Sequence, residues 1–210
     1  MDSYWESSWE KIDPSRLTQY IRRFELQPDI LIEYLHSQNV KTICDAGCGC
    51  GIHTLQLAVN GFDTSGFDVS SHAVEIARAL LKSASAHADL KAASILSTGY
   101  LDGQFDCVIS RDVIDHMTKE DGKTAVCELY RITRPGGMII VTLDSLDSEY
   151  ESEPHEINGD GDYLFTGGKW SGMIFHPYSK QEILEIIPVD AFFHIDCNAE
   201  EFIVKLKKPD

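Results

Sequence analysis

The sequence has few basic residues, and this shortage argues against partners that need them. Its 210 residues include 18 lysines and arginines against 34 aspartates and glutamates, which gives a formal net charge of −16. DNA and RNA binding requires a basic surface that neutralises phosphates, and anionic membranes attract basic segments. We therefore expect no nucleic-acid partner and no membrane partner, and a ligand that is neutral or cationic.

Long apolar runs and paired cysteines are missing as well. The longest strongly apolar run, at 138–141, is far shorter than the roughly 20 residues of a membrane-spanning helix. The N-terminal residues are acidic and aromatic, unlike an export signal with its basic start and apolar stretch. No pair of cysteines has the C-x-x-C spacing typical of zinc sites; they are Cys44, Cys48, Cys50, Cys107, Cys127 and Cys197. We expect a cytoplasmic protein without a metal.

Short β-rich runs alternate with helical patterns between residues 40 and 143, which predicts a parallel sheet covered by helices. The expected strands are 40–45, 62–68, 90–95, 105–110 and 138–143. The expected helices are 52–59, 70–81 and 119–133, the last of them stopped by Pro135-Gly136-Gly137. Together these elements predict a doubly wound α/β fold.

Both ends depart from this alternation. Residues 1–39 read as an arm of two helices, and residues 144–178 as an acidic, glycine-rich insertion whose first part, 144–156, we expect to be a solvated loop. A last helix at 179–187 precedes strands 192–197 and 201–206, which are close enough to form only a tight antiparallel hairpin. We therefore predict one domain, 1–210, with a mostly parallel seven-stranded sheet and an antiparallel C-terminal strand. Its parts are the arm or lid 1–39, the core 40–143, the insertion or cap 144–178 and the C-terminal part 179–210.

The clearest motif is a glycine loop where the first strand turns into a helix. Glycines 47, 49 and 51 let the backbone turn tightly and approach a ligand closely. A dinucleotide fingerprint, G-x-G-x-x-G, would need a third glycine at Ile52, which argues against a nicotinamide dehydrogenase. Asp45 beside the loop would repel a pyrophosphate and suit an ammonium group. The loop therefore indicates a ligand that is cationic at this end and carries no phosphate.

The run Asp45-Ala-Gly-Cys-Gly-Cys-Gly51 resembles the first motif of the class I S-adenosylmethionine-dependent methyltransferases. The resemblance implies a Rossmann-like fold with S-adenosylmethionine as cofactor. It implies that Asp45 lies near the methionine amino group and that the pocket floor is formed by Gly47, Cys48, Gly49 and Gly51. Asp68 ends the second strand, where this family places the acid that binds the ribose hydroxyls. Val69 follows it on the cofactor side.

Two later segments extend the resemblance. The run Leu101–Asp106 matches the family, but Ser94 stands where members have an acid that accepts the adenine amino group, and Ile95 is implied to pack on the adenine. The run Cys107–Met117 resembles the segment after the fourth strand. There Ser110 and Arg111 are implied to line the methionine moiety. His116 would sit near the mouth of the active site as the candidate catalytic base, and a purely structural histidine is the alternative.

We therefore expect transfer of a methyl group from S-adenosylmethionine to a small-molecule acceptor. Aromatic and imidazole side chains of the arm and the insertion are the candidate substrate-binding residues: Trp5, Trp9, Trp170 and His176. These outer segments resemble small-molecule and tellurite-resistance-type members of the family. Two alternatives stay open: a protein that binds S-adenosylmethionine or S-adenosylhomocysteine without methyl transfer, and an enzyme using the same pocket for other chemistry, such as aminopropyl transfer. The acceptor and the oligomeric state are left open.

Overall fold

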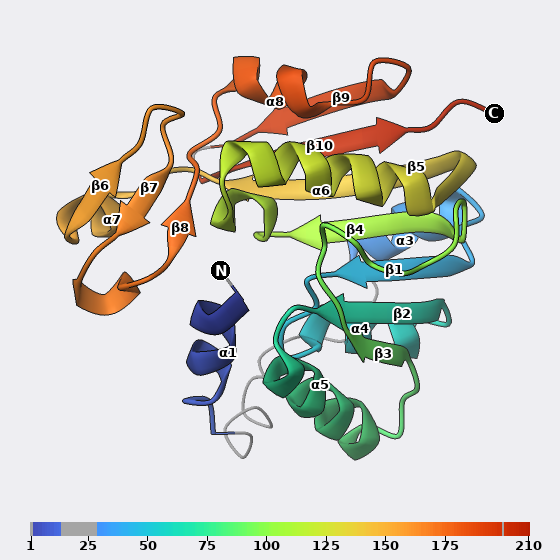
Figure 1. Cartoon of the computed structure of the whole chain (residues 1–210). Helices are drawn as coiled ribbons and strands as arrows, with labels where there is room; N and C mark the ends of the chain where they lie inside the picture. The colour runs from blue at the N-terminus through green and yellow to red at the C-terminus, as the bar shows by residue number, and fades with distance from the viewer. Residues whose placement is uncertain (1, 14–28, 199) are drawn as a thin grey trace.

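The computed structural model describes residues 2–13, 29–198 and 200–210 (Figure 1). Its α-helices are α1 (Asp2–Trp9), α3 (Ile30–Ser37), α4 (Ile52–Val59), α5 (Ser71–Ser83), α6 (Lys119–Ile132), α7 (Ser148–Ser152) and α8 (Lys180–Ile186). Short 3-10 turns are η1 (Ile114–His116) and η2 (Gly168–Trp170). The strands are β1 (Thr42–Ala46), β2 (Asp63–Asp68), β3 (Asp89–Ala92), β4 (Phe105–Arg111), β5 (Thr133–Asp144), β6 (His155–Ile157), β7 (Tyr163–Phe165), β8 (Ile174–Phe175), β9 (Phe192–Cys197) and β10 (Glu201–Lys207).

The main sheet has seven strands in the order β3-β2-β1-β4-β5-β10-β9. Neighbours among β1 to β5 pair in parallel, whereas β10 runs antiparallel to both β5 and β9. The strand order reverses at β1 and β4, and ligands of doubly wound sheets bind outside the carboxyl ends of the strands at such a point. The predicted fold class is confirmed, including the antiparallel C-terminal strand and the hairpin between β9 and β10.

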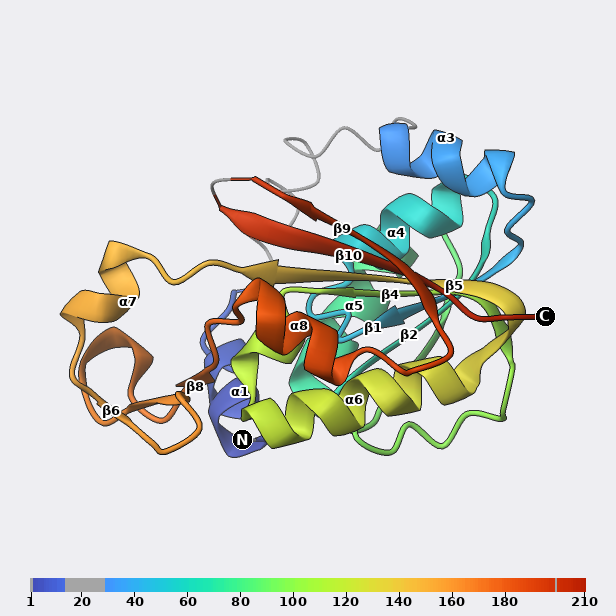
Figure 2. The same ribbon diagram turned by 90° about the horizontal axis from the view of Figure 1, so that it is seen from above.

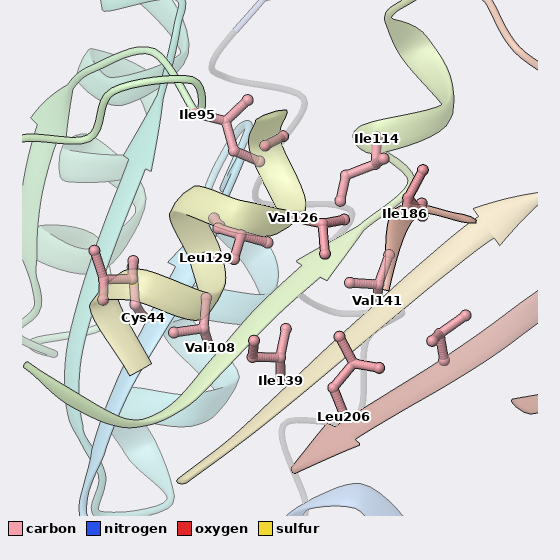
Figure 3. Close-up of a cluster of buried hydrophobic side chains, with 14 of the residues drawn as sticks. Cys44, Ile95, Val108, Ile114, Val126, Leu129, Ile139, Val141, Ile186 and Leu206 are labelled. Carbon is pink, nitrogen blue, oxygen red and sulfur yellow. The ribbon is translucent and has the colours of Figure 1, made fainter. Parts of the chain in front are cut away.

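Two layers of helices cover the sheet because its central strands are apolar on both faces. Alternate residues of β4 point to opposite sides: Val108 packs into the cluster under α6 and α8, and Cys107 into the cluster under α3 and α4. Ile139 and Ile140 of β5 divide in the same way. Figure 2 shows α6 and α8 on one side of the sheet and α3 and α4 on the other. Figure 3 shows the cluster that joins β4, β5 and β10 to α6 and α8.

The junction between α6 and β5 differs from the prediction. The helix ends at Ile132, and Thr133 already pairs with Phe105 as the first residue of β5. Pro135-Gly136-Gly137 therefore does not stop the helix but forms an irregular start of the strand, where Gly136 has a φ of +69°. Only a glycine adopts such a φ without strain, which is why the run looked like a helix terminator.

The segment 144–156 is exposed or partly exposed as expected, but it is not a loop throughout, because the insertion has its own regular structure. Residues 148–152 form α7, and β6, β7 and β8 form a separate antiparallel sheet. Its small core contains Phe165, Met173 and Phe175, with Tyr150 and Trp170 packed around them. Figure 1 shows this sheet beyond the ends to which the arrows of β1 and β4 point.

Within the described residues of the segment 1–39, the structure has the helices α1 and α3. Part of the predicted arm, residues 14–28, lies outside the described residues. Helix α1 lies beside α5 and next to the insertion (Figure 1), where Tyr4 and Trp5 pack against the aromatic core of the insertion. Among the helices of the described part of the chain, none is long and apolar enough to cross a membrane.

Candidate functional site

The main pocket opens at the carboxyl ends of β1 to β4 and has a volume of about 290 Å³. The turn after each of these strands contributes to its wall, and α1 and the start of α6 complete it. The lining residues are Trp5, Trp9, Gly47, Gly49, Phe67, Asp68, Val69, Ala93, Ser94, Ile95, Leu96, Arg111, Asp112, Val113, His116, Met117 and Asp121. Ten of the residues proposed from the sequence are brought together here. Six others, Asp45, Cys48, Gly51, Ser110, Trp170 and His176, are not among the lining residues.

The glycine loop forms one wall because glycine is required at each of its turns. Gly47, Gly49 and Gly51 all have positive φ angles. A Cβ on Gly47 would lie 2.4 Å from a methyl carbon of Val113, and one on Gly49 would lie 2.9 Å from the ring of Trp9. A Cβ on Gly51 would meet Ala77 of α5 at 2.6 Å, so this glycine allows the start of α4 to pack on α5. The first two glycines shape the pocket, and the third shapes the helix packing behind it.

Asp68 closes the loop at the end of β2. Its Oδ2 accepts a hydrogen bond from the Gly49 backbone N–H at 2.9 Å, and its Oδ1 accepts one from Ser70 at 2.9 Å. A carboxylate has about four lone-pair sites, so both oxygens can accept further bonds from a ligand. Burial raises the pKa of Asp68, against the lowering effect of the two backbone donors. The arrangement suits a pair of neighbouring hydroxyl donors.

Asp45, expected near the methionine amino group, lies behind the loop and is not among the lining residues. Its Oδ2 accepts a hydrogen bond from Thr54 Oγ1 at 2.5 Å, and its side chain is buried. Burial raises the pKa of Asp45, while His53 and Arg111 nearby oppose that shift. On the pocket side, Arg111 donates to His53 Nδ1 at 3.2 Å. The carboxylate thus anchors the start of α4 and contributes its charge to this end of the pocket from behind.

A second part of the pocket is apolar. Val69 follows β2, Ala93, Ile95 and Leu96 follow β3, and Met117 also lines the pocket. Ile95 and Met117 are buried in the same hydrophobic cluster. Flat apolar ligand groups suit such a slot between branched side chains. Ser94 is at its edge, where its Oγ accepts a hydrogen bond from Leu96 N at 3.2 Å.

His116 lies at the part of the pocket nearest the insertion, in the turn η1 after β4. Its ring meets Trp5 of α1 edge-on, with 5.1 Å between centroids, and Phe175 of β8 at 5.6 Å. Burial lowers the pKa of His116 to about 4, so the imidazole is neutral at neutral pH. Its Nδ1 is buried without a hydrogen-bond partner in the described structure.

Carboxylates surround the same turn. Asp115 is buried, its Oδ2 accepts from the Asp144 backbone N–H at 3.0 Å, and burial raises its pKa to about 7. The pKa of Asp144 is raised to about 6, first by burial and then by Asp112 and Asp115. Thr142 Oγ1 donates to Asp112 at 2.5 Å. This end of the pocket therefore has a negative potential, which favours neutral or cationic groups.

Two of the predicted substrate-binding residues, Trp170 and His176, belong to the framework of the insertion instead. His176 is buried, with its Nδ1 2.8 Å from Asp162 Oδ1, and its backbone N–H donates to the Asp115 carbonyl at 2.7 Å. Trp170 packs on Tyr150. Among the non-lining cofactor candidates, Cys48 packs in the cluster under α4 and α5, and Ser110 is buried within β4.

Several lining residues were missed from the sequence: Phe67, Ala93, Leu96, Val113, Met117 and Asp121. Four of them are immediate neighbours of residues that were named, and extending each motif by one residue would have found them. Val113 lies within the matched run 107–117. Its place on the pocket wall follows from its closeness to Gly47, which the sequence does not show. Asp121 lies in the first turn of α6, and no motif points to it.

The residues present fit S-adenosylmethionine. The loop glycines leave room for close approach, the two oxygens of Asp68 suit the ribose hydroxyls, and the slot between Val69 and Ile95 suits the adenine. Among the described residues that line the pocket, Arg111 is the one lysine or arginine, so these residues form no basic cluster for phosphates. Within the described residues no group of histidine, cysteine and acidic side chains has the arrangement of a metal site.

Comparisons with known proteins agree. Residues 43–137 match the methyltransferase domain family. A putative methyltransferase of Bacillus subtilis is 30% identical over 153 residues, which cover 72% of this chain and 59% of that protein. A ubiquinone biosynthesis O-methyltransferase of Dechloromonas aromatica is 25% identical over 103 residues, 49% of this chain and 44% of the relative. The chain thus spans about half the length of the curated relatives it matches.

A solved S-adenosylmethionine-dependent methyltransferase structure from Methanosarcina mazei superposes with a TM-score of 0.72 at 18% identity, covering 87% of this chain and 99% of that one. At this identity the match supports the fold. Residues 43–137 are therefore similar to the methyltransferase domain family, and the chain shares the doubly wound fold of a solved S-adenosylmethionine-dependent methyltransferase.

Proposed function

We propose that this chain is an enzyme that transfers the methyl group of S-adenosylmethionine to a small-molecule acceptor. The observation that carries the proposal is one continuous pocket with two kinds of wall. The glycine loop, Asp68 and the Val69–Ile95 slot form the wall suited to the cofactor, and His116 lies on the wall beneath α1 and the insertion. A sulfonium supplies a methyl group already activated for displacement.

The protein's task is then to hold the acceptor in line with that methyl group and to exclude water. Trp5 and Trp9 line the pocket from α1, and Glu6 holds this helix in place by accepting a hydrogen bond from Ser71 Oγ at 2.8 Å. Tyr4 and Trp5 continue into the aromatic core of the insertion. These contacts support a cover made of α1 and the insertion, which shields the reacting groups and chooses the acceptor.

His116 is the candidate base in this arrangement. A neutral imidazole can accept the proton of an acceptor that arrives protonated, and the low pKa keeps it neutral through the physiological range. The acidic surroundings of Asp112, Asp115 and Asp144 support a neutral or cationic acceptor. A net charge of −16 argues against a nucleic-acid acceptor.

We further propose one methyltransferase domain acting in the cytoplasm. All six cysteines are free thiols, which suits a reducing compartment. The outer segments differ in build from the sheet and its helices, but the aromatic contacts between α1 and the insertion, and the position of α1 on the pocket wall, support a single functional unit.

The test is a turnover assay over amine, thiol, phenol and metalloid acceptors that measures release of S-adenosylhomocysteine, beside calorimetry with the cofactor. We expect binding at micromolar concentrations or tighter, about −8 kcal/mol, and turnover with one acceptor class. Binding of NAD without S-adenosylmethionine would overturn the proposal. Cofactor binding without product from any acceptor would favour the alternative of a binding protein without methyl transfer. Release of another nucleoside product would favour other chemistry in the same pocket.

A further inference from the structure

At the position where the family resemblance implies an acid, the apolar slot offers the hydroxyl of Ser94, a weaker acceptor than a carboxylate. Ser94 is at its edge, but its Oγ already accepts from Leu96 N, and its carbonyl accepts from Ser97 N at 3.1 Å. The serine therefore holds the turn after β3. A base bound in the slot through its ring faces would still need a partner for polar groups on its edge, since burying an unpaired donor is costly.

Asp121 supplies a carboxylate on the same pocket wall. The residue lines the pocket and is half-buried in the first turn of α6. Its backbone N–H is bonded to the helix cap Thr118, but within the described residues its side chain makes no hydrogen bond or ion pair. Asp112 also lines the pocket, but it follows β4, on the side of Gly47, and is bonded to Thr142.

The packing of α6 against the loop after β3 places Asp121 close to the slot. This loop runs beside α6 (Figure 2), and Glu128 of the helix accepts from Thr98 N of the loop at 2.8 Å. Asp121, Ala125 and Glu128 are spaced by four and three residues, so they share one face of the helix. Asp121 precedes Glu128 by two turns, which is about 10 Å along the helix axis. At that position the same face of α6 lies beside the end of the loop that lines the pocket. There lie Ile95 and Leu96, the two residues beyond Ser94.

Asp121 could also have a purely structural role, because acids in the first turn of a helix interact favourably with the helix dipole. Glu120 shares that turn and is exposed to solvent. A dipole role requires neither a side chain on the pocket wall nor one without a partner. The two neighbouring acids therefore differ in one respect, which is access to the slot.

We propose that Asp121 accepts a hydrogen bond from the exocyclic amino group of the adenine, and so takes the role that the family resemblance implies for an acid at the position of Ser94. The proposal rests on the proposed function, since it concerns the cofactor of the same pocket. An ionised carboxylate can only accept hydrogen bonds. It therefore favours a base with an amino group at this position over one with a carbonyl oxygen, and a site built to pair with a donor rejects an analogue that lacks it.

The test compares two ligands by calorimetry: S-adenosylhomocysteine, and S-inosylhomocysteine, which has a carbonyl oxygen in place of the amino group. We expect the wild-type protein to prefer the adenosyl ligand. Asp121→Ala should weaken the adenosyl ligand by about 10- to 150-fold, the range for a hydrogen bond to a charged group, and leave the affinity for the inosyl ligand unchanged or improved. Glu120→Ala removes the same charge from the same helix turn and should leave both dissociation constants within about twofold.

A second variant checks the placement. In Asp121→Ala combined with Ser94→Asp, an aspartate can keep the turn to Leu96 N and present its second oxygen to the slot, so the preference for the adenosyl ligand should return. The assignment of Asp121 is wrong if Asp121→Ala keeps the wild-type preference for the adenosyl ligand. It is also wrong if the double variant shows no more preference for that ligand than the single variant. If the wild-type protein binds neither ligand, the proposed function itself fails, which is a different result.

Discussion

The two walls of the pocket are built in different ways. The wall formed by the sheet uses backbone groups of the glycine loop and one buried carboxylate, all fixed by long strands that pair in parallel. The wall formed by α1 uses aromatic side chains on a short helix, and behind it the insertion packs aromatic side chains of strands of two or three residues against Tyr4 and Trp5. The first wall has little freedom to vary, because its shape is that of the backbone. The second can change its side chains without disturbing the sheet.

The largest expected effect belongs to His116, where the two walls meet. His116→Gln should lower kcat by about 10²- to 10⁴-fold, the usual contribution of a general base, and leave the affinity for S-adenosylhomocysteine within a few-fold. Because the pKa of His116 is lowered to about 4, the acid limb of the rate profile should lie near that pH. His194→Gln, an exposed change on β9, is the control. An unchanged kcat in the His116 variant would show that this histidine is structural and not the catalytic base.

The next effect tests the wall of the sheet. Asp68→Ala should weaken binding of S-adenosylhomocysteine by about 10- to 150-fold in calorimetry, because a hydrogen-bonded charge is lost. Burial raises the pKa of Asp68. As the solution is acidified, the affinity of the wild-type protein should therefore begin to fall at a higher pH than it would if this aspartate were exposed. Asp63→Ala, at the exposed start of the same strand, should bind normally. Equal dissociation constants for the two variants would mean that another group holds the ribose.

The cover should affect turnover more than binding or folding. Deletion of residues 1–12 removes the ring contacts of Trp5 and Tyr4, and a few such contacts are worth about tenfold in rate. The midpoint of global unfolding should change little, because the sheet and its clusters remain. Hydrogen exchange of the full chain should show α1 and residues 145–178 gaining protection when S-adenosylhomocysteine is added. A truncated chain that turns over at the full rate would show that α1 only packs.

The last prediction concerns the stability of the fold and Asp115, which precedes His116 in η1. Its pKa of about 7 in the folded state exceeds the ordinary 3.8, so the folded protein binds a proton that the unfolded chain releases. The contribution of Asp115 to stability is therefore lost as the pH rises from about 4 to about 7, at most about 1.4 kcal/mol per pH unit. Relative to wild type, Asp115→Asn should be more stable at pH 8 than at pH 5 in urea unfolding.

His116 titrates in part of the same range with the opposite sign, because its folded pKa is depressed. The wild-type pH profile alone is therefore a poor measure, and the difference between variant and wild type isolates Asp115. A difference that is equal at both pH values would show that Asp115 is ionised in the fold at pH 5 as well.

The sheet and its loop were predictable because local signals there agree with the tertiary structure. The helix 52–59 matched residue for residue, and the alternation of Cys107, Val108 and Ile109 marks a strand buried on both faces. Asp68 was predictable because it ends a strand at a fixed distance from the glycines. Spacing along the chain carried this information.

The insertion was not predictable for the opposite reason. Its strands have two or three residues, too few for a period, and they are stabilised by packing between Phe165, Met173 and Phe175 rather than by local propensity. His176 looked like a ligand contact because a histidine among aromatics suggests a pocket, but its partner Asp162 lies 14 residues away along the chain. Asp121 was missed since only the packing of α6 on the loop after β3 brings it to the pocket.

The insertion is fastened to the core at more points than its two chain ends. Besides its connections to β5 and α8, it makes two hydrogen bonds to the core. Asp162 Oδ1 accepts from the Lys119 backbone N–H at 2.9 Å, and the His176 backbone N–H donates to the Asp115 carbonyl. Asp162 thus accepts a hydrogen bond from the first turn of α6, and the contact of its side chain with His176 holds it in place. A homologous segment grafted between positions 144 and 179 to change the acceptor would have to bring an equivalent aspartate and histidine. Without them, the graft would leave the beginning of α6 with an open donor and loosen the pocket it was meant to reshape.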